Sequence, residues 1–259
     1  FYLGDNARTP YGTRSFEIVY EFTLQAVNKL FEMGCHLVIL ACNTASAKAL
    51  RSIQMNDLPG IDPERRVLGV IRPTVECIGD ITQRSHIGVL ATAGTIKSES
   101  YPLEIHKLFP DIQVSGMACP MWVPLVENNE SQNEGADYFI RKYINQLLSK
   151  DPEIDTMILG CTHYPILLPK IQAYPHCRTR RICSRKSEGL PEQTPGNESQ
   201  MHPKRQLSVL HHRGGREVCR IGLFLPEPAN RRKKNLSRIN MGKLINLSFF
   251  FVIFVDSNP

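Results

Sequence analysis

The sequence predicts an α/β fold, and two observations favour it. Up to residue 172, short apolar runs ending in Gly, Thr, Asn or Cys alternate with amphipathic segments, the pattern of a parallel sheet with crossover helices. In addition, the runs that end at Cys42, Thr92 and Cys161 are similar to one another. This echo reflects either the common composition of buried strands or two related half-domains that face each other across a cleft.

The first elements alternate between helix and strand. Segment 20–33 is predicted to be a helix because Phe22, Ala26, Leu30 and Met33 form an apolar stripe at helical spacing. It leads into a predicted strand at 36–41. A helix at 45–53 and a strand at 67–71 follow.

The later elements repeat this alternation. Pro73 is expected to begin a helix, because proline is tolerated at the first helical position. A strand at 87–91, a loop at 92–95 and a helix at 98–108 come next. An amphipathic helix at 138–148 then precedes the strand at 154–159, which ends beside Cys161.

Composition limits the class of protein. The chain has 259 residues, 42% of them hydrophobic, enough for one large domain or two small ones. The eight cysteines are too few for a disulfide scaffold and no secretory signal is recognised ahead of them, so we expect a reducing, cytoplasmic compartment. The longest apolar run, 244–255, is broken by Asn246 and Ser248, so no membrane span is expected.

The net charge of +6 is unevenly distributed. Residues 1–172 hold 15 basic and 19 acidic side chains, whereas residues 173–259 hold 16 basic and 6 acidic ones. Helical and strand periodicity also stops near residue 173, which predicts a low-order basic tail over 173–259. Because its basic runs lack interleaved aromatic residues or a recognisable module, no nucleic-acid partner is expected.

Two cysteines occupy equivalent places. Cys42 and Cys161 each follow a predicted buried strand, and ligands of open α/β sheets bind outside the carboxyl ends of such strands. A helix after Cys42 favours its thiolate, and His163 can exchange a proton close to Cys161. The spacing therefore predicts a pair of thiols that transfer protons near neutral pH. Short polar side chains suited to a carboxylate follow them, namely Asn43, Thr44, Thr162 and those of the 92–95 loop.

Other interpretations of these residues remain open. Cysteine often packs as a small apolar residue, which we expect for Cys35, Cys77 and Cys119. Asn43 and Thr44 could cap the next helix. Zinc binding is disfavoured because the sequence has no C-x-x-C pair and no H-x-x-x-H helix. A Cys/His nucleophilic hydrolase is a further alternative, although it leaves one of the two cysteines without a role.

Six segments, taken in order, carry a specific resemblance to a known family. The segments are 4–12, 41–47, 69–73, 91–96, 123–127 and 160–165. On these segments the chain resembles bacterial glutamate racemases of the aspartate/glutamate racemase superfamily over roughly residues 1–172. The resemblance implies cofactor-independent and metal-independent interconversion of L- and D-glutamate, which supplies D-glutamate for peptidoglycan of the cell wall. It also implies two pseudo-symmetric parallel-sheet α/β domains, 1–83 and 84–172, with the active site in the cleft between them.

The resemblance also implies roles for single residues. Cys42 would remove the α-proton of D-glutamate and Cys161 that of L-glutamate. The expected partner is this small molecule, not a membrane, and a homodimer is compatible with the family. An aspartate racemase of the same superfamily would use the same thiols. Substrate-contacting positions of the family fall on Tyr11, Gly12, Asn43, Thr44, Thr162 and His163.

The chain departs from the family pattern at both ends. The family begins with a strand ending in an Asp-Ser-Gly motif, whereas this chain starts at what corresponds to the second strand, so we expect an N-terminally truncated first half-domain. After Gln172 the α/β pattern stops, which a reading-frame shift near Ala173 would explain. A non-catalytic fragment is the resulting alternative to an active enzyme.

Overall fold

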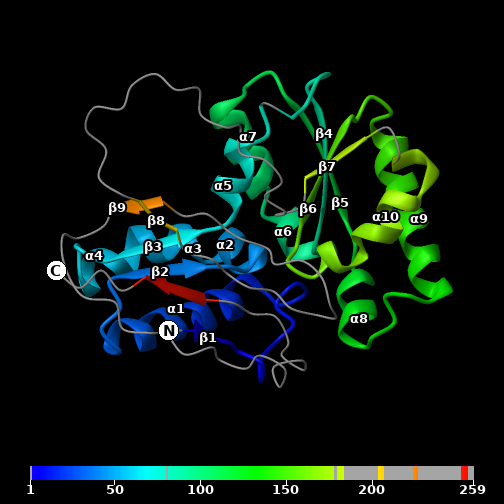
Figure 1. The fold of residues 1–259 in the computed structure, drawn as a ribbon. Helices are drawn as coiled ribbons and strands as arrows, with labels where there is room; N and C mark the ends of the chain where they lie inside the picture. The colour runs from blue at the N-terminus through cyan, green and yellow to red at the C-terminus, as the bar shows by residue number, and fades with distance from the viewer. Residues whose placement is uncertain are drawn as a thin grey trace. The chain divides into compact units, whose positions relative to one another are not determined.

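The computed structural model describes residues 2–79, 81–177, 180–183, 204–206, 224–226 and 252–255. The chain divides into two compact units, Phe1–Ser184 with Ser248–Asn258, and Arg185–Leu247 with Pro259. In the second unit, β8 (Lys204–Gln206) and β9 (Phe224–Pro226) form an antiparallel pair. The first unit contains two four-stranded sheets, which appear in Figure 1 with their helices.

The first sheet has the strand order β1-β10-β2-β3. Its strands are β1 (Tyr2–Leu3), β10 (Val252–Val255), β2 (Leu37–Leu40) and β3 (Arg66–Gly69). β2 and β3 are parallel, whereas β10 runs antiparallel to both of its neighbours. A segment from the far end of the chain therefore lies inside this sheet.

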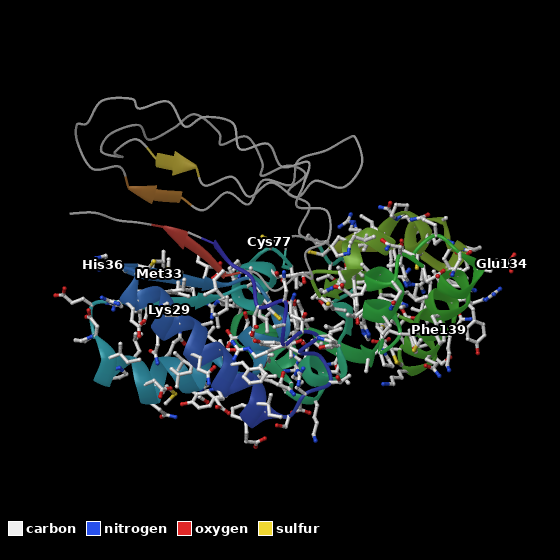
Figure 2. All side chains as sticks on the ribbon, turned by 90° about the horizontal axis from the view of Figure 1, so that it is seen from below. Lys29, Met33, His36, Cys77, Glu134 and Phe139 are labelled. Carbon is white, nitrogen blue, oxygen red and sulfur yellow. The ribbon has the colours of Figure 1, made fainter. Side chains whose placement is uncertain are left out.

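Helices of the N-terminal half cover one face of this sheet. They are α1 (Phe16–Glu32), α2 (Asn43–Lys48), α3 (Leu50–Ser52), the π-helical turn η1 (Ile53–Asp57) and α4 (Leu58–Ile61). The next helix, α5 (Ile71–Glu76), packs in the core of the second sheet instead. Val38 and Leu40 alternate with half-buried neighbours along β2 and share a core with Leu30 of α1. At the end of α1, Lys29, Met33 and His36 lie at the surface (Figure 2).

The second sheet is entirely parallel, with the order β5-β4-β6-β7. Its strands are β4 (His86–Ala91), β5 (Gln113–Ala118), β6 (Thr156–Gly160) and β7 (Arg181–Cys183). Ala91 is paired with both Ala118 and Gly160, so β4, β5 and β6 end at the same edge. β6 is buried along its whole length, as expected for a central parallel strand.

Helices cover both faces of the second sheet (Figure 1). On one side are α8 (Trp122–Glu127), α9 (Glu134–Lys150), the turn η2 (Tyr164–Leu167), α10 (Leu168–Ala173) and the turn η3 (Pro175–Cys177). On the other are α5, α6 (Ala93–Lys97) and α7 (Ser100–Leu108). Trp122 anchors the first of these layers, its ring packing edge-on against Tyr164 with centroids 4.7 Å apart.

The structure confirms the predicted α/β class and corrects several elements. Met33, expected in the buried stripe of the first helix, is 44% exposed, because α1 ends at Glu32 and Met33 is its C-cap. The 92–95 segment is not a loop, since Thr92 caps α6, which begins at Ala93. Pro73 is the third residue of its helix rather than the first. Cys35 and Cys119 are buried as expected, whereas Cys77 is exposed.

The range 173–259 was predicted to be a low-order tail. Within it the structure describes the end of α10, the turn η3 and the strands β7 to β10; the other positions lie outside the described residues. Among the described residues, no helix combines the length and apolar character needed to cross a membrane.

Candidate active site

Cys42 lies where β2 gives way to α2. Its backbone is extended (φ −97°, ψ 126°), and α2 begins at the next residue, so Cys42 is the N-cap. Asn43 and Thr44 are thus in the first helical turn and are not the caps considered from sequence. The Cys42 thiol is half-buried at the positive end of the helix backbone, where a thiolate is favoured.

Cys161 occupies the corresponding position after β6. Burial raises the pKa of its thiol to about 12, although the backbone N–H of His163 and the hydroxyl of Thr162 act in the opposite direction. Charges on Cys42 and Glu127 raise this pKa further, which puts both groups within electrostatic reach of Cys161. Sequence reasoning predicted proton exchange near neutral pH at both thiols. For Cys161, the protein environment alone raises the pKa of the thiol and does not bring it near neutral.

His163 connects Cys161 to a carboxylate that sequence reasoning missed. The Sγ atom of Cys161 lies 3.7 Å from Nδ1 of His163, and Nε2 of His163 is hydrogen-bonded to Oε1 of Glu127 on α8. With the Nε2 proton donated to Glu127, the neutral imidazole presents Nδ1 as an acceptor toward the thiol. His163 is buried, whereas the Glu127 side chain is one-third exposed.

Three threonine hydroxyls meet beside the start of α2 and α6. Oγ1 of Thr44 lies 2.9 Å from Oγ1 of Thr92 and 3.4 Å from that of Thr95, and the last two are 3.1 Å apart. All three side chains are buried. Because each hydroxyl can donate or accept, the cluster can reorient toward an anion. The two threonines of the 92–95 segment thus join Thr44, which follows Cys42.

Tyr11 and Gly12 approach this cluster from the N-terminal loop. The hydroxyl of Tyr11 donates to Asp5, whose carboxylate also accepts from Arg8 (Nε–Oδ1 2.9 Å). Burial, followed by the bond to Asp5, raises the pKa of Tyr11 far above its usual range, and Cys42 contributes in the same direction. A Cβ on Gly12 would lie 2.9 Å from two carbon atoms of Thr92, so only glycine fits there.

Only some of the predicted site residues contact a thiol directly. Thr162 is half-buried and bonded to Cys161, while Asn43 is buried and accepts a hydrogen bond from Tyr101 of α7 (2.8 Å). Electrostatic coupling links Cys42 to both Cys161 and Tyr11. In the described part of the chain, no group of three His, Cys, Asp or Glu side chains is arranged to hold a metal ion.

Comparison with known proteins identifies the family of this chain. The model of the Asp/Glu/Hydantoin racemase family matches residues 1–179. The chain therefore belongs to the Asp/Glu/Hydantoin racemase family.

The similar proteins compared within this family are named glutamate racemases. The chain is 42% identical over 178 residues to the glutamate racemase of Persephonella marina, a match covering 68% of this chain and 65% of that protein. Among solved structures it is similar to glutamate racemase RacE1 of Bacillus anthracis (35% identity, TM-score 0.62, 69% of this chain and 64% of that one). It is also similar to the Francisella tularensis glutamate racemase in complex with D-glutamate (31% identity, TM-score 0.60, 69% and 63%). The chain thus spans just under two thirds of these proteins.

Proposed function

We propose that this chain carries the two-thiol site of a glutamate racemase, which interconverts L- and D-glutamate without a cofactor and supplies D-glutamate for peptidoglycan. The observation that carries the proposal is the pair Cys42 and Cys161, which lie just after β2 and β6, with the charge of Cys42 raising the pKa of Cys161. The two solved structures compared above are named glutamate racemases, and one of them is a complex with D-glutamate. The two half-domains, 1–83 and 84–172, would each supply one thiol.

Proton transfer on opposite faces of the α-carbon requires one thiolate and one thiol. In the D-to-L direction, the Cys42 thiolate takes the α-proton, the electron pair stays on the α-carbon, and the Cys161 thiol returns its own proton to the other face. The raised pKa of Cys161 suits this state, because a negative Cys42 keeps Cys161 protonated. Atoms balance, since one S–H bond forms as the other breaks.

The L-to-D direction requires an ionised Cys161. His163 can accept the thiol proton at Nδ1, 3.7 Å away, while Glu127 stabilises the resulting imidazolium through Nε2. The ammonium group of the substrate would also lower the pKa of Cys161 by placing a positive charge near it. We therefore assign Cys161, His163 and Glu127 to proton removal from L-glutamate, and Cys42 to removal from D-glutamate.

Substrate carboxylates need hydrogen-bond donors. The amide of Asn43 and the hydroxyls of Thr44 and Thr162 lie next to the thiols in sequence, and Thr92 is bonded to Thr44. Tyr11 and Gly12 enclose the same region through contacts with Asp5 and Thr92. The two carboxylates of glutamate would be held by these donors, with its α-carbon between the two sulfur atoms.

A Cys/His hydrolase is the second candidate, favoured by one observation. Cys161, His163 and Glu127 form a nucleophile, a base and an orienting carboxylate in order, as in cysteine hydrolases. Such an enzyme would acylate Cys161 and would not need Cys42. An aspartate racemase would need both thiols and differ only in the preferred side-chain length.

The test follows α-hydrogen exchange in D₂O for the full chain with each enantiomer of glutamate, by nuclear magnetic resonance and polarimetry. We expect deuterium incorporation and racemisation without added pyridoxal phosphate or metal. Cys42→Ser and Cys161→Ser should both abolish racemisation, whereas Cys77→Ser, which changes an exposed thiol, should not. A chain that racemises aspartate but not glutamate, that only forms a thioester at Cys161 with an activated acyl substrate, or that exchanges no α-hydrogen, as a non-catalytic fragment would, would overturn the proposal.

A separate experiment tests which thiol removes the proton from which enantiomer. With a glutamate analogue that eliminates a leaving group after loss of the α-proton, Cys161→Ser should process the D-enantiomer and fail with the L-enantiomer. Cys42→Ser should show the reverse preference. Equal residual action of either variant on both enantiomers would contradict the assignment of one thiol to each face.

A further inference from the structure

Tyr101, which no sequence motif singled out, touches the segments that carry both thiols. It lies on α7 and is 2% exposed. Its hydroxyl donates to Oδ1 of Asn43 at 2.8 Å, and Asn43 directly follows Cys42. A Cβ built on Gly160 would lie 3.0 Å from ring atom Cε2 of Tyr101, and Gly160 directly precedes Cys161. One side chain therefore spans from one cysteine-bearing segment to the other.

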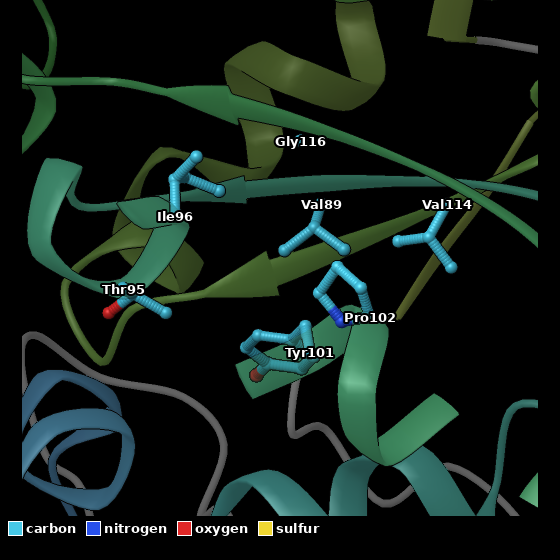
Figure 3. A pocket seen from close by; sticks show the side chains of 7 residues that line it. All are labelled: Val89, Thr95, Ile96, Tyr101, Pro102, Val114 and Gly116. Atoms are coloured by element: carbon cyan, nitrogen blue, oxygen red, sulfur yellow. The ribbon is translucent and has the colours of Figure 1, made fainter. Parts of the chain in front are cut away.

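The surroundings of the ring keep Tyr101 in this orientation. Figure 3 shows the ring beside Pro102 and below Val89 of β4, with Thr95 of the threonine cluster farther to the left. These side chains belong to the lining of a small apolar cavity of about 30 Å³. Tyr101 is otherwise packed in the buried core that contains Val89 and Ile158, which leaves the ring little space in which to tilt. The hydroxyl is thus held toward Asn43 by packing as well as by its hydrogen bond.

The Tyr101 bond also sets which end of the Asn43 amide remains for a ligand. A phenol proton donated to Oδ1 occupies the acceptor of the amide and leaves the two N–H donors of Nδ2. Carboxylates need donors, so this orientation suits the anionic substrate and the reversed one does not. Because Asn43 is buried, its amide has few other ways to satisfy Oδ1.

We propose that Tyr101 is a positioning residue: its hydroxyl orients the Asn43 amide toward a substrate carboxylate, while its ring, lying against Gly160, sets the position of Cys161 relative to Cys42. The substrate part of this inference rests on the proposed racemase function. Tyr101 transfers no proton itself, since it acts through Asn43 and the Cys161 segment.

The primary test compares Tyr101→Phe with Tyr174→Phe in the full chain. Tyr174 also donates to an asparagine Oδ1 at 2.8 Å, that of Asn145 on α9, which makes it a matched control. For Tyr101→Phe we expect kcat/KM to fall about 10–100-fold in both directions, with a raised KM, because small misplacement of reacting groups costs that much. Tyr174→Phe should stay within about twofold of the parent. Tyr101→Phe kinetics within twofold of the parent would overturn the proposal.

A second readout does not depend on turnover. Iodoacetamide alkylation of Cys161, followed by mass spectrometry, should be about threefold or more faster in Tyr101→Phe than in Tyr174→Phe, because a released ring no longer holds the segment that buries this thiol. Failure of the parent to act on glutamate would overturn the proposed function but would leave this measurement decisive for Tyr101. Equal alkylation rates in the two variants would remove the positioning role at Cys161.

Asn43→Asp tests the amide orientation and keeps the inference falsifiable if Tyr101→Phe does not fold. The aspartate still accepts from Tyr101, so Cys161 alkylation should stay within about twofold of the parent. It replaces the N–H donors by a carboxylate oxygen, so D-glutamate affinity measured by calorimetry should fall about 50-fold or more through charge repulsion. Unchanged D-glutamate affinity would show that the amide donors do not face the ligand.

Discussion

Burial of Cys161 opposes the loss of its thiol proton. The thiol is 8% exposed and its pKa is raised to about 12, yet the proposed L-to-D step requires its thiolate. The hydrogen-bonded path through His163 to Glu127 offers a way to move that proton locally, without exposing the sulfur to water. Cys42, by contrast, is half-buried and lies at the start of α2. The two thiols are therefore inequivalent.

This inequivalence predicts a one-sided effect of Glu127→Gln. We expect α-proton removal from L-glutamate to slow by about 10–100-fold, because the His163 imidazolium loses its stabilising charge. Removal from D-glutamate, which begins at Cys42, should slow less. Elimination from each enantiomer of the leaving-group analogue measures the two proton removals separately, with the exposed Glu134→Gln as control. Equal slowing for both enantiomers would contradict the assignment.

The raised pKa of Cys161 also predicts how stability depends on pH. Between its ordinary value of 9.0 and about 12, the unfolded chain has lost the thiol proton while the native chain retains it. The unfolded state binds fewer protons there, so the free energy of unfolding falls as pH rises through this window.

The Cys161 contribution is at most about 1.4 kcal/mol per pH unit. Urea unfolding at several pH values should show a shallower fall in Cys161→Ala than in the parent. Cys77→Ala, which removes an exposed thiol, should follow the parent. Parallel curves for Cys161→Ala and the parent would show that the thiol is not held protonated by burial.

At the scale of the elements, close contact between β4 and α9 depends on a glycine. A Cβ on Gly88 would lie 2.7 Å from Cδ2 of Leu147 and 3.2 Å from Cδ1 of Ile154, and both side chains are buried in the core, so they would have to move to accept it. Gly88→Ala should therefore lower the free energy of unfolding by about 1–3 kcal/mol. Gly60→Ala is the control, since a methyl group added there in α4 would meet nothing within 4 Å and alanine favours helices. Chemical denaturation of the two variants measures the difference, and equal stability would contradict the packing argument.

Elements with strong periodicity were predictable from sequence, and those without it were not. The central strands β2, β4 and β6 were predicted because they are continuous apolar runs. β5 was missed, because it contains Ser115 and Gly116 and none of its residues is fully buried. α8 was missed as well, since it is short, carries Pro124 inside and is apolar on most sides. The sequence of α8 therefore shows no helical periodicity. Glu127, the last residue of α8, was missed for the same reason.

The candidate site was predictable where it follows strand ends. Cys42, Cys161 and His163 were found because chemistry-bearing residues directly after apolar runs stand out in the sequence. Tyr101 was not found, because a tyrosine inside an amphipathic helix resembles any core residue. Only the tertiary structure brings it to Asn43, 58 positions away in sequence.

At the scale of the whole molecule, β10 connects distant parts of the chain. It pairs with β2 over residues 252–255 and is the strand to which β1 bonds. Deleting 248–259 should therefore expose the backbone of β2 on one side. By hydrogen exchange, we expect the amides of β2 to lose about tenfold or more of their protection, while those of β6 in the all-parallel sheet serve as the internal reference. Unchanged exchange in β2 would contradict its pairing with β10.

The chain contains a single tryptophan, and its position makes it an intrinsic spectroscopic reporter. Trp122 is fully buried, packs edge-on against Tyr164 and begins the helix that ends at Glu127. Indole emission depends on local polarity and on nearby groups, and Tyr164 directly follows His163 in the chain. Changes at Cys161 and His163 are therefore expected to alter the emission of Trp122, through its contact with Tyr164 and through α8. Ligand binding and proton movement on this side can be followed by emission alone, without a label.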